Sequence, residues 1–183
     1  MERKGSGLQP IAISLTVAAA LLRLVPHPPN FAPIGGIALF GGSRLSGWQA
    51  YLVPILAMLV TDPLVSLAVG APAYSWMTPI IYGCFLINVL IGRFCLGSNP
   101  KIPRIMTFAL AGSLQFYLIT NFFVWLRATT LYPHTIAGLT ACYIAALPFF
   151  GNTVLADLFY TAILFGAYAL LRNRESGNIR AAV

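Results

Sequence analysis

Apolar residues occur along the chain in six long runs, separated by short polar or proline-rich segments. The runs cover residues 8–25, 31–46, 48–70, 79–97, 105–127 and 136–172. A helix that crosses a membrane needs about 20 mainly apolar residues, and most of these runs reach that length. The pattern therefore predicts an all-α integral membrane protein, folded as a six-transmembrane-helix bundle.

The last run is too long for a single crossing. As a helix rising about 1.5 Å per residue, it would reach about 54 Å. Pro148 and Gly151 lie near its middle, and a proline inside a helix breaks or kinks it because the residue lacks an N–H group. We therefore expect a partial helix over 136–150, re-entrant or at the membrane surface, and a full crossing over 151–172.

The second run, 31–46, is short and glycine-rich, so its crossing is open. Basic residues help to decide, because cytoplasmic loops collect them. If the run crosses, only Arg23 and Arg127 lie outside, and nine basic residues lie inside: Arg3, Lys4, Arg44, Arg93, Lys101, Arg104, Arg172, Arg174 and Arg180. Without that crossing, three lie inside and eight outside. Six crossings with both termini cytoplasmic are therefore preferred, and the first run, which resembles a signal peptide, is interpreted as a retained span.

Composition supports the same class. Of the 183 residues, 58% are hydrophobic and 8% are charged, and the mean hydropathy is +0.82. No polar linker divides the chain, so residues 1–183 are expected to form one transmembrane domain. The net charge of +7 comes from basic residues near the ends of the apolar runs. That placement suits lipid headgroups of the bilayer, and we predict no nucleic-acid partner.

Polar residues within the runs gather toward one face of the membrane. Asp62, Asn121 and Asp157 lie about 9–12 Å from the outer ends of their predicted helices, and Tyr82 and Cys84 lie nearer those ends. The outer loops add Arg23, His27, Asn30, Arg127 and His134. A polar group is costly inside a membrane helix and often marks a functional site. The sequence therefore predicts an outward-facing polar cavity, rimmed by the proline-rich segment 23–30.

Plainer interpretations of these residues stay open. Asp62 can form a structural ion pair with Arg23 or Arg127, and Asp157 can be a hydrogen-bonded packing residue. The two histidines, which could bind a ligand or a metal, are in other respects ordinary loop residues. Cys84 is either a soft ligand near the outer mouth or a packing residue.

Tyr117, Asn121 and Trp125 are spaced four residues apart and therefore share one helix face. An amide between two aromatic rings suits a planar polar ligand. Alternatively, Trp125 belongs to an interfacial aromatic belt and Asn121 makes an interhelical hydrogen bond.

Small residues on the first run form a ridge that permits close helix contact. The ridge consists of Ala12, Thr16 and Ala20. It can pack within the bundle or dock a separate membrane subunit.

The motifs that mark familiar enzyme and nucleotide sites are missing. The chain has no HExxH, no GxSxG, no P-loop and no Rossmann fingerprint. Its three cysteines lack CxxC spacing, so they predict neither a disulfide framework nor a zinc site. We predict no cofactor and no metal, and any ATP-driven step would require another chain.

Several segments resemble an uncharacterised family of small bacterial membrane proteins. They include Arg23-Leu24-Val25-Pro26-His27-Pro28-Pro29-Asn30, Thr120-Asn121-Phe122, Cys142-Tyr143, and Asn152-Thr153 followed by Asp157. That family in turn resembles the substrate-binding S components of energy-coupling-factor vitamin transporters in fold, size and hydropathy. The resemblance implies a multi-pass protein of the bacterial cytoplasmic (inner) membrane that holds a vitamin-like molecule near its outer face. It also implies either a transmembrane T subunit with ATPases, docked on the small-residue ridge, or a solitary protein such as a cobalamin transporter.

The function predicted from the sequence is micronutrient binding for membrane transport, with a cobalamin-type ligand as one suspicion. The predicted ligand-binding residues are Arg23, His27, Asn30, Asp62, Tyr82, Cys84, Tyr117, Asn121, Trp125, Arg127, His134, Tyr143, Asn152 and Asp157. Two other classes stay open. One is an intramembrane enzyme that uses aspartate and histidine for acid–base or metal chemistry, and the other is a structural or assembly subunit.

Overall fold

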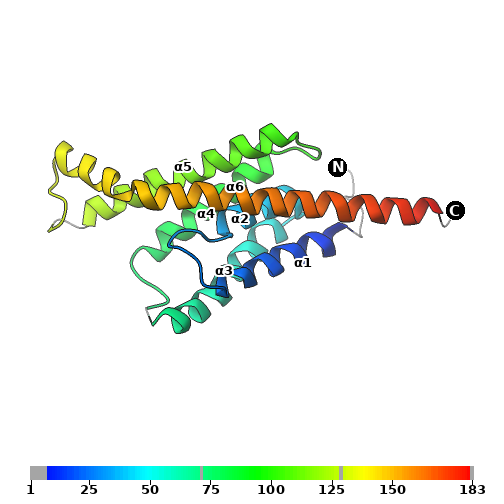
Figure 1. Cartoon of the computed structure of the whole chain (residues 1–183), viewed down its shortest axis with the longest axis horizontal. Coiled ribbons are helices and arrows are strands. Elements are labelled where there is room, and N and C mark those ends of the chain that lie inside the picture. The colour runs from blue at the N-terminus through cyan, green and yellow to red at the C-terminus, as the bar shows by residue number, and fades with distance from the viewer. Residues whose placement is uncertain (1–7, 71, 128–129, 182–183) are drawn as a thin grey trace.

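The chain is all-helical in the part that the structure describes. The structure is a computed structural model that describes residues 8–70, 72–127 and 130–181. Its elements are α1 (Leu8–Leu21), the 3-10 helix η1 (Leu22–Leu24), α2 (Ile34–Arg44), α3 (Gln49–Val69), α4 (Thr78–Cys95), α5 (Ile102–Arg127) and α6 (Ile136–Ala181). The start of α1 and the end of α6 lie at the same end of the bundle (Figure 1).

Among the described residues, four helices are long and apolar enough to cross a membrane. They are α3, α4, α5 and the part of α6 between Ile136 and Glu175, whereas Leu8–Leu24 forms a shorter apolar helix. Large apolar side chains are exposed on the outside of these helices, for example Leu67 on α3, Phe94 on α4 and Leu170 on α6. An apolar perimeter of this kind is typical of a helix bundle surrounded by lipid.

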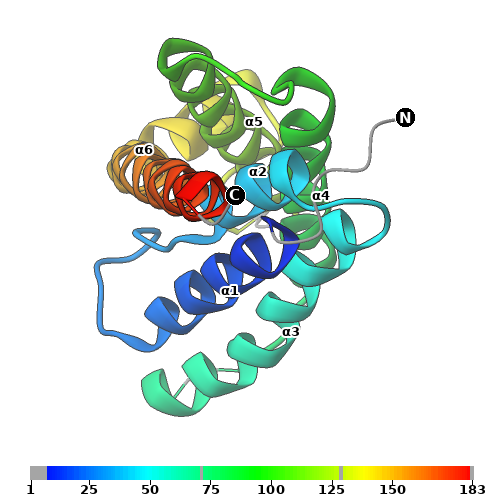
Figure 2. The same cartoon turned by 90° about the vertical axis from the view of Figure 1, so that its right-hand side faces the viewer.

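The short helix α2 lies at the centre of the bundle, among α1, α4, α5 and α6 (Figure 2). All eleven of its residues are buried. Its closest partner is α4, because glycine allows the two backbones to touch. A Cβ atom added to Gly42 would lie 2.0 Å from the carbonyl oxygen of Val89, and one added to Gly92 would lie 2.1 Å from that of Leu39. The core also contains Phe40, whose ring packs edge to face against that of Phe165 with the ring centroids 5.3 Å apart.

The prediction that 31–46 crosses the membrane as a full helix is wrong. Eleven residues of helix reach only about 16 Å, well short of a hydrocarbon core of about 30 Å. Even so, the chain returns to its starting end over residues 25–44. Gln9, near the start of α1, donates a hydrogen bond to the carbonyl oxygen of Arg44 at 3.1 Å, and Ser46 donates its backbone N–H to Gln9 at 3.0 Å. The proline-rich loop covers the rest of the distance.

The predicted break at Pro148 and Gly151 is also absent, because α6 is one helix of 46 residues from Ile136 to Ala181. There is thus no separate half-helix over 136–150. Figure 1 shows instead that the first, yellow turns of α6 are inclined to the rest of the helix. A proline removes one backbone hydrogen bond and bends a helix without ending it when the surrounding turns are held by packing.

Candidate functional site

A cavity of about 350 Å³ opens between the helices and is lined by both polar and apolar side chains. Its walls come from α2, α3, α4, α5 and α6 together with the loops that follow η1 and α3. Its polar lining consists of Arg23, Asn30, Asp62, Ser66, Ser75, Thr78, Tyr82, Asn88, Thr153 and Asp157. Five of these, Arg23, Asn30, Asp62, Tyr82 and Asp157, are ligand-binding candidates predicted from the sequence.

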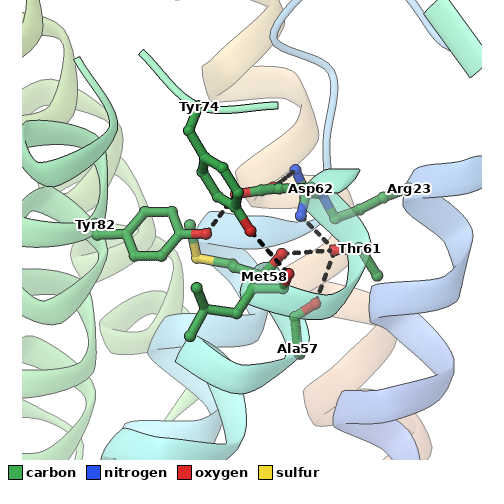
Figure 3. Close-up of polar contacts among 8 residues, drawn as sticks. Arg23, Ala57, Met58, Thr61, Asp62, Tyr74 and Tyr82 are labelled. Atoms are coloured by element: carbon green, nitrogen blue, oxygen red, sulfur yellow. Dashed lines mark hydrogen bonds and ion pairs between the residues drawn. The ribbon is translucent and has the colours of Figure 1, made fainter. Parts of the chain in front are cut away.

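One polar cluster of the cavity is centred on Asp62 (Figure 3). Arg23 Nη2 lies 2.6 Å from Asp62 Oδ1, and the Tyr82 hydroxyl donates to Asp62 Oδ2 at 2.5 Å. Arg23 also donates to the hydroxyl of Thr61, which donates in turn to the carbonyl oxygen of Ala57 at 2.8 Å. An ion pair that is partly buried, as this one is, is tolerated when further hydrogen bonds satisfy its remaining atoms. Of the two arginines that the sequence left open as partners, Arg23 pairs with Asp62.

Pro63 explains how this cluster is anchored on α3. Because proline has no N–H group, the carbonyl oxygen of Leu59 loses its normal helical donor. The hydroxyl of Tyr74, from the loop between α3 and α4, donates to that oxygen at 3.2 Å. The Asp62–Pro63 step therefore creates an acceptor that ties the loop to the helix beside the cavity.

Asp157 provides a second, separate carboxylate. It is 5% exposed, and Ser113 of α5 donates a hydrogen bond to its Oδ2 at 2.5 Å. Within the described residues, Arg23–Asp62 is the one ion pair, so Asp157 has no cationic partner there. Its other oxygen lies against α2, where a Cβ added to Gly35 would come within 2.0 Å of Oδ1. Glycine at this position leaves room for the carboxylate.

Amide and aromatic groups complete the cavity. Asn88 is buried and accepts a hydrogen bond from Gln115 at 3.1 Å, and the same amide of Gln115 donates to the carbonyl oxygen of Cys84 at 3.0 Å. The rings of Phe85 and Phe116 stack with their centroids 5.2 Å apart, and both line the cavity. The site thus combines an apolar and aromatic body with a few fixed polar groups, which is the usual design of a small-molecule site.

Tyr117 and Asn121 lie in a neighbouring cavity of about 160 Å³. This smaller cavity shares Asn30, Phe116 and Thr153 with the larger one. The Asn121 amide donates to the carbonyl oxygen of Tyr117 at 2.8 Å, and the Tyr117 hydroxyl donates to that of Tyr143 at 2.7 Å. The predicted aromatic and amide face therefore lies beside the main cavity, with much of its hydrogen bonding directed to backbone.

The other predicted candidates line neither of these cavities. Cys84 is buried, and His27 is at the surface of the proline-rich loop. Four more hold loops or helix ends: Trp125 donates to the Pro133 carbonyl, His134 contacts the Leu126 carbonyl, Arg127 lies over the Trp76 ring, and Asn152 donates to the Pro29 carbonyl. Tyr143 of α6 donates to the Leu118 carbonyl and so connects α6 to α5.

The small-residue ridge on α1 faces the interior. Ala12 and Thr16 are fully buried and Ala20 is 3% exposed, and the two alanines belong to the core cluster around Phe40. Of the two roles that the sequence left open for the ridge, its burial favours packing within the bundle. The physical reason is that α1 places this face against the other helices of the chain and its larger side chains, such as Leu21, outward.

Some residues of the site were not among the predicted ones. They are Asn88, Ser113 and Gln115, which connect α4, α5 and α6, and the ring pair of Phe85 and Phe116. Asn88 carried a signal, since an amide within an apolar helix is unusual. Ser113 did not, because a serine in a membrane helix often bonds only its own backbone. In the described part of the chain, no group of three metal-ligating side chains comes together.

The described part of the chain is an all-helical bundle that has four helices long and apolar enough to cross a membrane and an internal cavity of small-molecule size. The chain belongs to a family of unknown function, DUF6580, whose model matches residues 7–179. No curated protein and no solved structure matches the chain.

Proposed function

We propose that this chain is a micronutrient-binding membrane transport protein, similar in type to the S components of energy-coupling-factor transporters. The observation that carries the proposal is the cavity of about 350 Å³, with apolar walls and separated polar groups, near one end of the bundle. Its size lies at the lower end of the range of about 300–1,000 Å³ that is usual for ligand sites. The proposed orientation places the cavity toward the outside of the bacterial inner membrane and the basic helix ends toward the cytoplasm.

Charge favours a ligand with a positive or N–H-rich group. The charged residues of the lining are Arg23, Asp62 and Asp157, and the first two neutralise each other. A buried carboxylate that lacks a cation is costly, so a cationic nitrogen of the ligand would stabilise Asp157. The adjacent rings of Phe85 and Phe116 suit a flat apolar body or a cation above a ring face.

The size of the cavity and the position of Cys84 argue against a cobalamin-type ligand. A corrinoid is several times larger than a single-ring vitamin, whereas the cavity is at the small end of the usual range. The buried Cys84 also does not line the cavity. The proposal is therefore restricted to a small, single- or double-ring molecule.

The proline-rich loop would act as the rim of the site. Asn30 lines both cavities and has a φ of 62°, a left-handed conformation that asparagine tolerates better than most residues. Its neighbours fix the loop on α6: Asn152 donates to the Pro29 carbonyl at 3.0 Å, and the ring of Phe31 lies 5.8 Å from that of Tyr160. Release of a ligand would require this contact with α6 to open.

The test is a thermal-unfolding and native-mass-spectrometry screen of the purified protein against cationic thiamin, neutral nicotinamide and anionic nicotinate. We expect the cationic compound to stabilise the wild type and its affinity to fall about tenfold or more in Asp157→Asn, because a hydrogen bond to a charged group is worth about 1.5–3 kcal/mol. Thr140→Ala, on an exposed turn of α6, is the matched control and should bind normally. If no vitamin of any charge binds, the transport proposal fails and a structural role for the Arg23–Asp62 pair is favoured.

A further inference from the structure

The cavity around Asp157 contains a second deeply buried polar group, the amide of Asn88. The lining residues of α4 begin at Thr78, beside the loop between α3 and α4, and end at Asn88. Asp157 is likewise the last lining residue of α6. The two side chains are 2% and 5% exposed. The proposed transport function uses Asp157, but it gives no role to Asn88.

The helix α5 brings the amide and the carboxylate next to each other. A Cβ atom added to Gly112 would lie 2.7 Å from Asn88 Oδ1 and 3.2 Å from its Nδ2, so the amide packs directly on the backbone of α5. Asp157 accepts its hydrogen bond from Ser113, which is the next residue of the same helix. Because successive Cα atoms are only about 3.8 Å apart, the two polar groups meet α5 at neighbouring positions, and both line the same cavity.

The hydrogen bonds of Asn88 determine which of its atoms is left for the cavity. The amide nitrogen of Gln115 donates to the carbonyl oxygen of Cys84 at 3.0 Å and to Asn88 Oδ1 at 3.1 Å. A backbone carbonyl can only accept, so it fixes the orientation of the Gln115 amide, which in turn fixes that of Asn88. In the part of the chain that the structure describes, no hydrogen bond uses Asn88 Nδ2. Asn88 therefore offers the cavity a hydrogen-bond donor.

This end of the cavity thus combines an acceptor with a donor. An ionised carboxylate accepts hydrogen bonds and an amide nitrogen donates them. The stacked rings of Phe85 and Phe116 lie one helical turn away, since Phe85 precedes Asn88 by three residues on α4 and Phe116 follows Ser113 by three residues on α5. The arrangement suits a flat group with the opposite pattern of donor and acceptor.

We propose that Asn88 determines the chemical class of the ligand: a flat ring compound that carries a carbonyl-type acceptor in addition to its cationic or N–H group. The inference rests on the proposed function, in which Asp157 binds the cationic group. Asn88 Nδ2 donates to the acceptor. A site built to form a hydrogen bond with its ligand discriminates against an analogue that lacks the bonding atom, because the buried donor is then left unpaired.

The test compares two probes of equal charge and nearly equal size. They are N-methylpyridinium ions that carry either an acetyl or an isopropyl group in the meta position. Both present the same cation to Asp157, and only the acetyl compound has an oxygen that can accept a hydrogen bond. Isothermal titration calorimetry of the purified full-length protein measures both affinities. We expect the wild type to bind the acetyl compound about tenfold more tightly, as one hydrogen bond allows.

Substitutions then assign this preference to a residue. Asn88→Leu should abolish the preference, and Asp157→Asn should weaken both compounds by a similar factor. Asn88→Ala removes the same donor without adding bulk and serves if Asn88→Leu does not fold. Asn99→Leu is the matched control, because Asn99 is an exposed loop residue outside this cavity, and it should keep the preference. A purely structural role of Asn88 would lower both affinities together and leave their ratio unchanged.

The outcomes separate this inference from the proposed function. If both compounds bind through Asp157 with equal affinity, or if the preference survives in Asn88→Leu and Asn88→Ala, the role of Asn88 is overturned and the transport proposal stands. If neither compound binds the wild type, the cavity does not take ring cations. The role of Asn88 and the proposed cationic ligand are then both overturned.

Discussion

At the scale of single residues, the position of Asp157 depends on the absence of a side chain at Gly35. The Cβ atom of an alanine there would lie 2.0 Å from Asp157 Oδ1 and 2.8 Å from Oδ2. The carboxylate could avoid this overlap by turning, but the turn would break its hydrogen bond from Ser113. The space left by Gly35 and the hydrogen bond from Ser113 thus both determine the position of the carboxylate.

We predict that Gly35→Ala destabilises the protein by about 1–3 kcal/mol, the range typical of overpacking and of a lost hydrogen bond to a charged group. Thermal unfolding in a fixed detergent measures the change. Gly83→Ala is the control, because no atom lies within 4 Å of its added Cβ and alanine favours a helix. In an Asp157→Ala background, Gly35→Ala should have almost no further effect. A cost that persists there would show that the overlap with the carboxylate is not its cause.

The two aspartates show how far single residues could be understood from the sequence. A carboxylate in an apolar run is conspicuous. For Asp62 the sequence offered two arginine partners on the predicted outer side, Arg23 and Arg127, and the structure shows that Arg23 is the partner. The partner of Asp157 was not visible. Serine and threonine are common in membrane helices, and only the packing of α5 against α6 selects Ser113. The apolar pattern of each helix does not determine how far one helix is shifted along its axis relative to the other, and this shift decides which residues meet.

At the scale of one element, Pro63 leaves a defect in α3 that a loop residue fills. Because Pro63 has no N–H group, the carbonyl oxygen of Leu59 lacks its helical donor. The Tyr74 hydroxyl donates a hydrogen bond to that oxygen instead (Figure 3). We predict that Tyr74→Phe costs about 0.5–1.5 kcal/mol, the usual contribution of one hydrogen bond. In a Pro63→Ala background the backbone N–H of residue 63 can bond Leu59 itself, so Tyr74→Phe should then cost almost nothing.

A double-mutant cycle of thermal stability measures this coupling between Tyr74 and Pro63. Tyr51→Phe is a suitable control, because the Tyr51 hydroxyl belongs to another turn of α3 and should give the same cost with or without Pro63. Equal costs of Tyr74→Phe in both backgrounds would mean that the loop residue does not compensate for the proline.

The helices α2 and α6 show which features of an element its sequence leaves undecided. The boundaries of α3, α4 and α5 lie within three residues of the predicted runs, since long apolar runs bounded by polar residues are strong signals. A buried helix and a membrane-crossing helix are both apolar on all sides, so the run 31–46 could not reveal that only Ile34–Arg44 is helical. In α6, the effect of Pro148 depends on how neighbouring turns are held, which is a property of packing.

At the scale of the whole molecule, the path of the chain matters more than the length of each helix. The hydrogen bonds between Gln9 and the end of α2 show that residues 25–44 return the chain to its starting end. The later helices then alternate in direction, and α6 finishes at the end where α1 begins (Figure 1). A short central helix joined to a proline-rich loop therefore has the same consequence for direction as a full crossing.

This path makes a prediction about sidedness that a membrane-impermeant thiol reagent can check. Four exposed loop positions are suitable for single cysteine substitutions: Ser46, Lys101, Ser75 and His134. Cys95 is best replaced by serine in each variant, because it is the most accessible of the native cysteines. We expect the residue 46 and 101 variants to react from one side of the membrane and the residue 75 and 134 variants only from the other. The charge distribution predicts that the first side is cytoplasmic. If residue 46 reacts together with residue 75, then residues 25–44 do not return across the membrane. The cavity around Asp157 would then not be shown to lie on the side opposite the basic helix ends, and its proposed outward orientation would have to be abandoned.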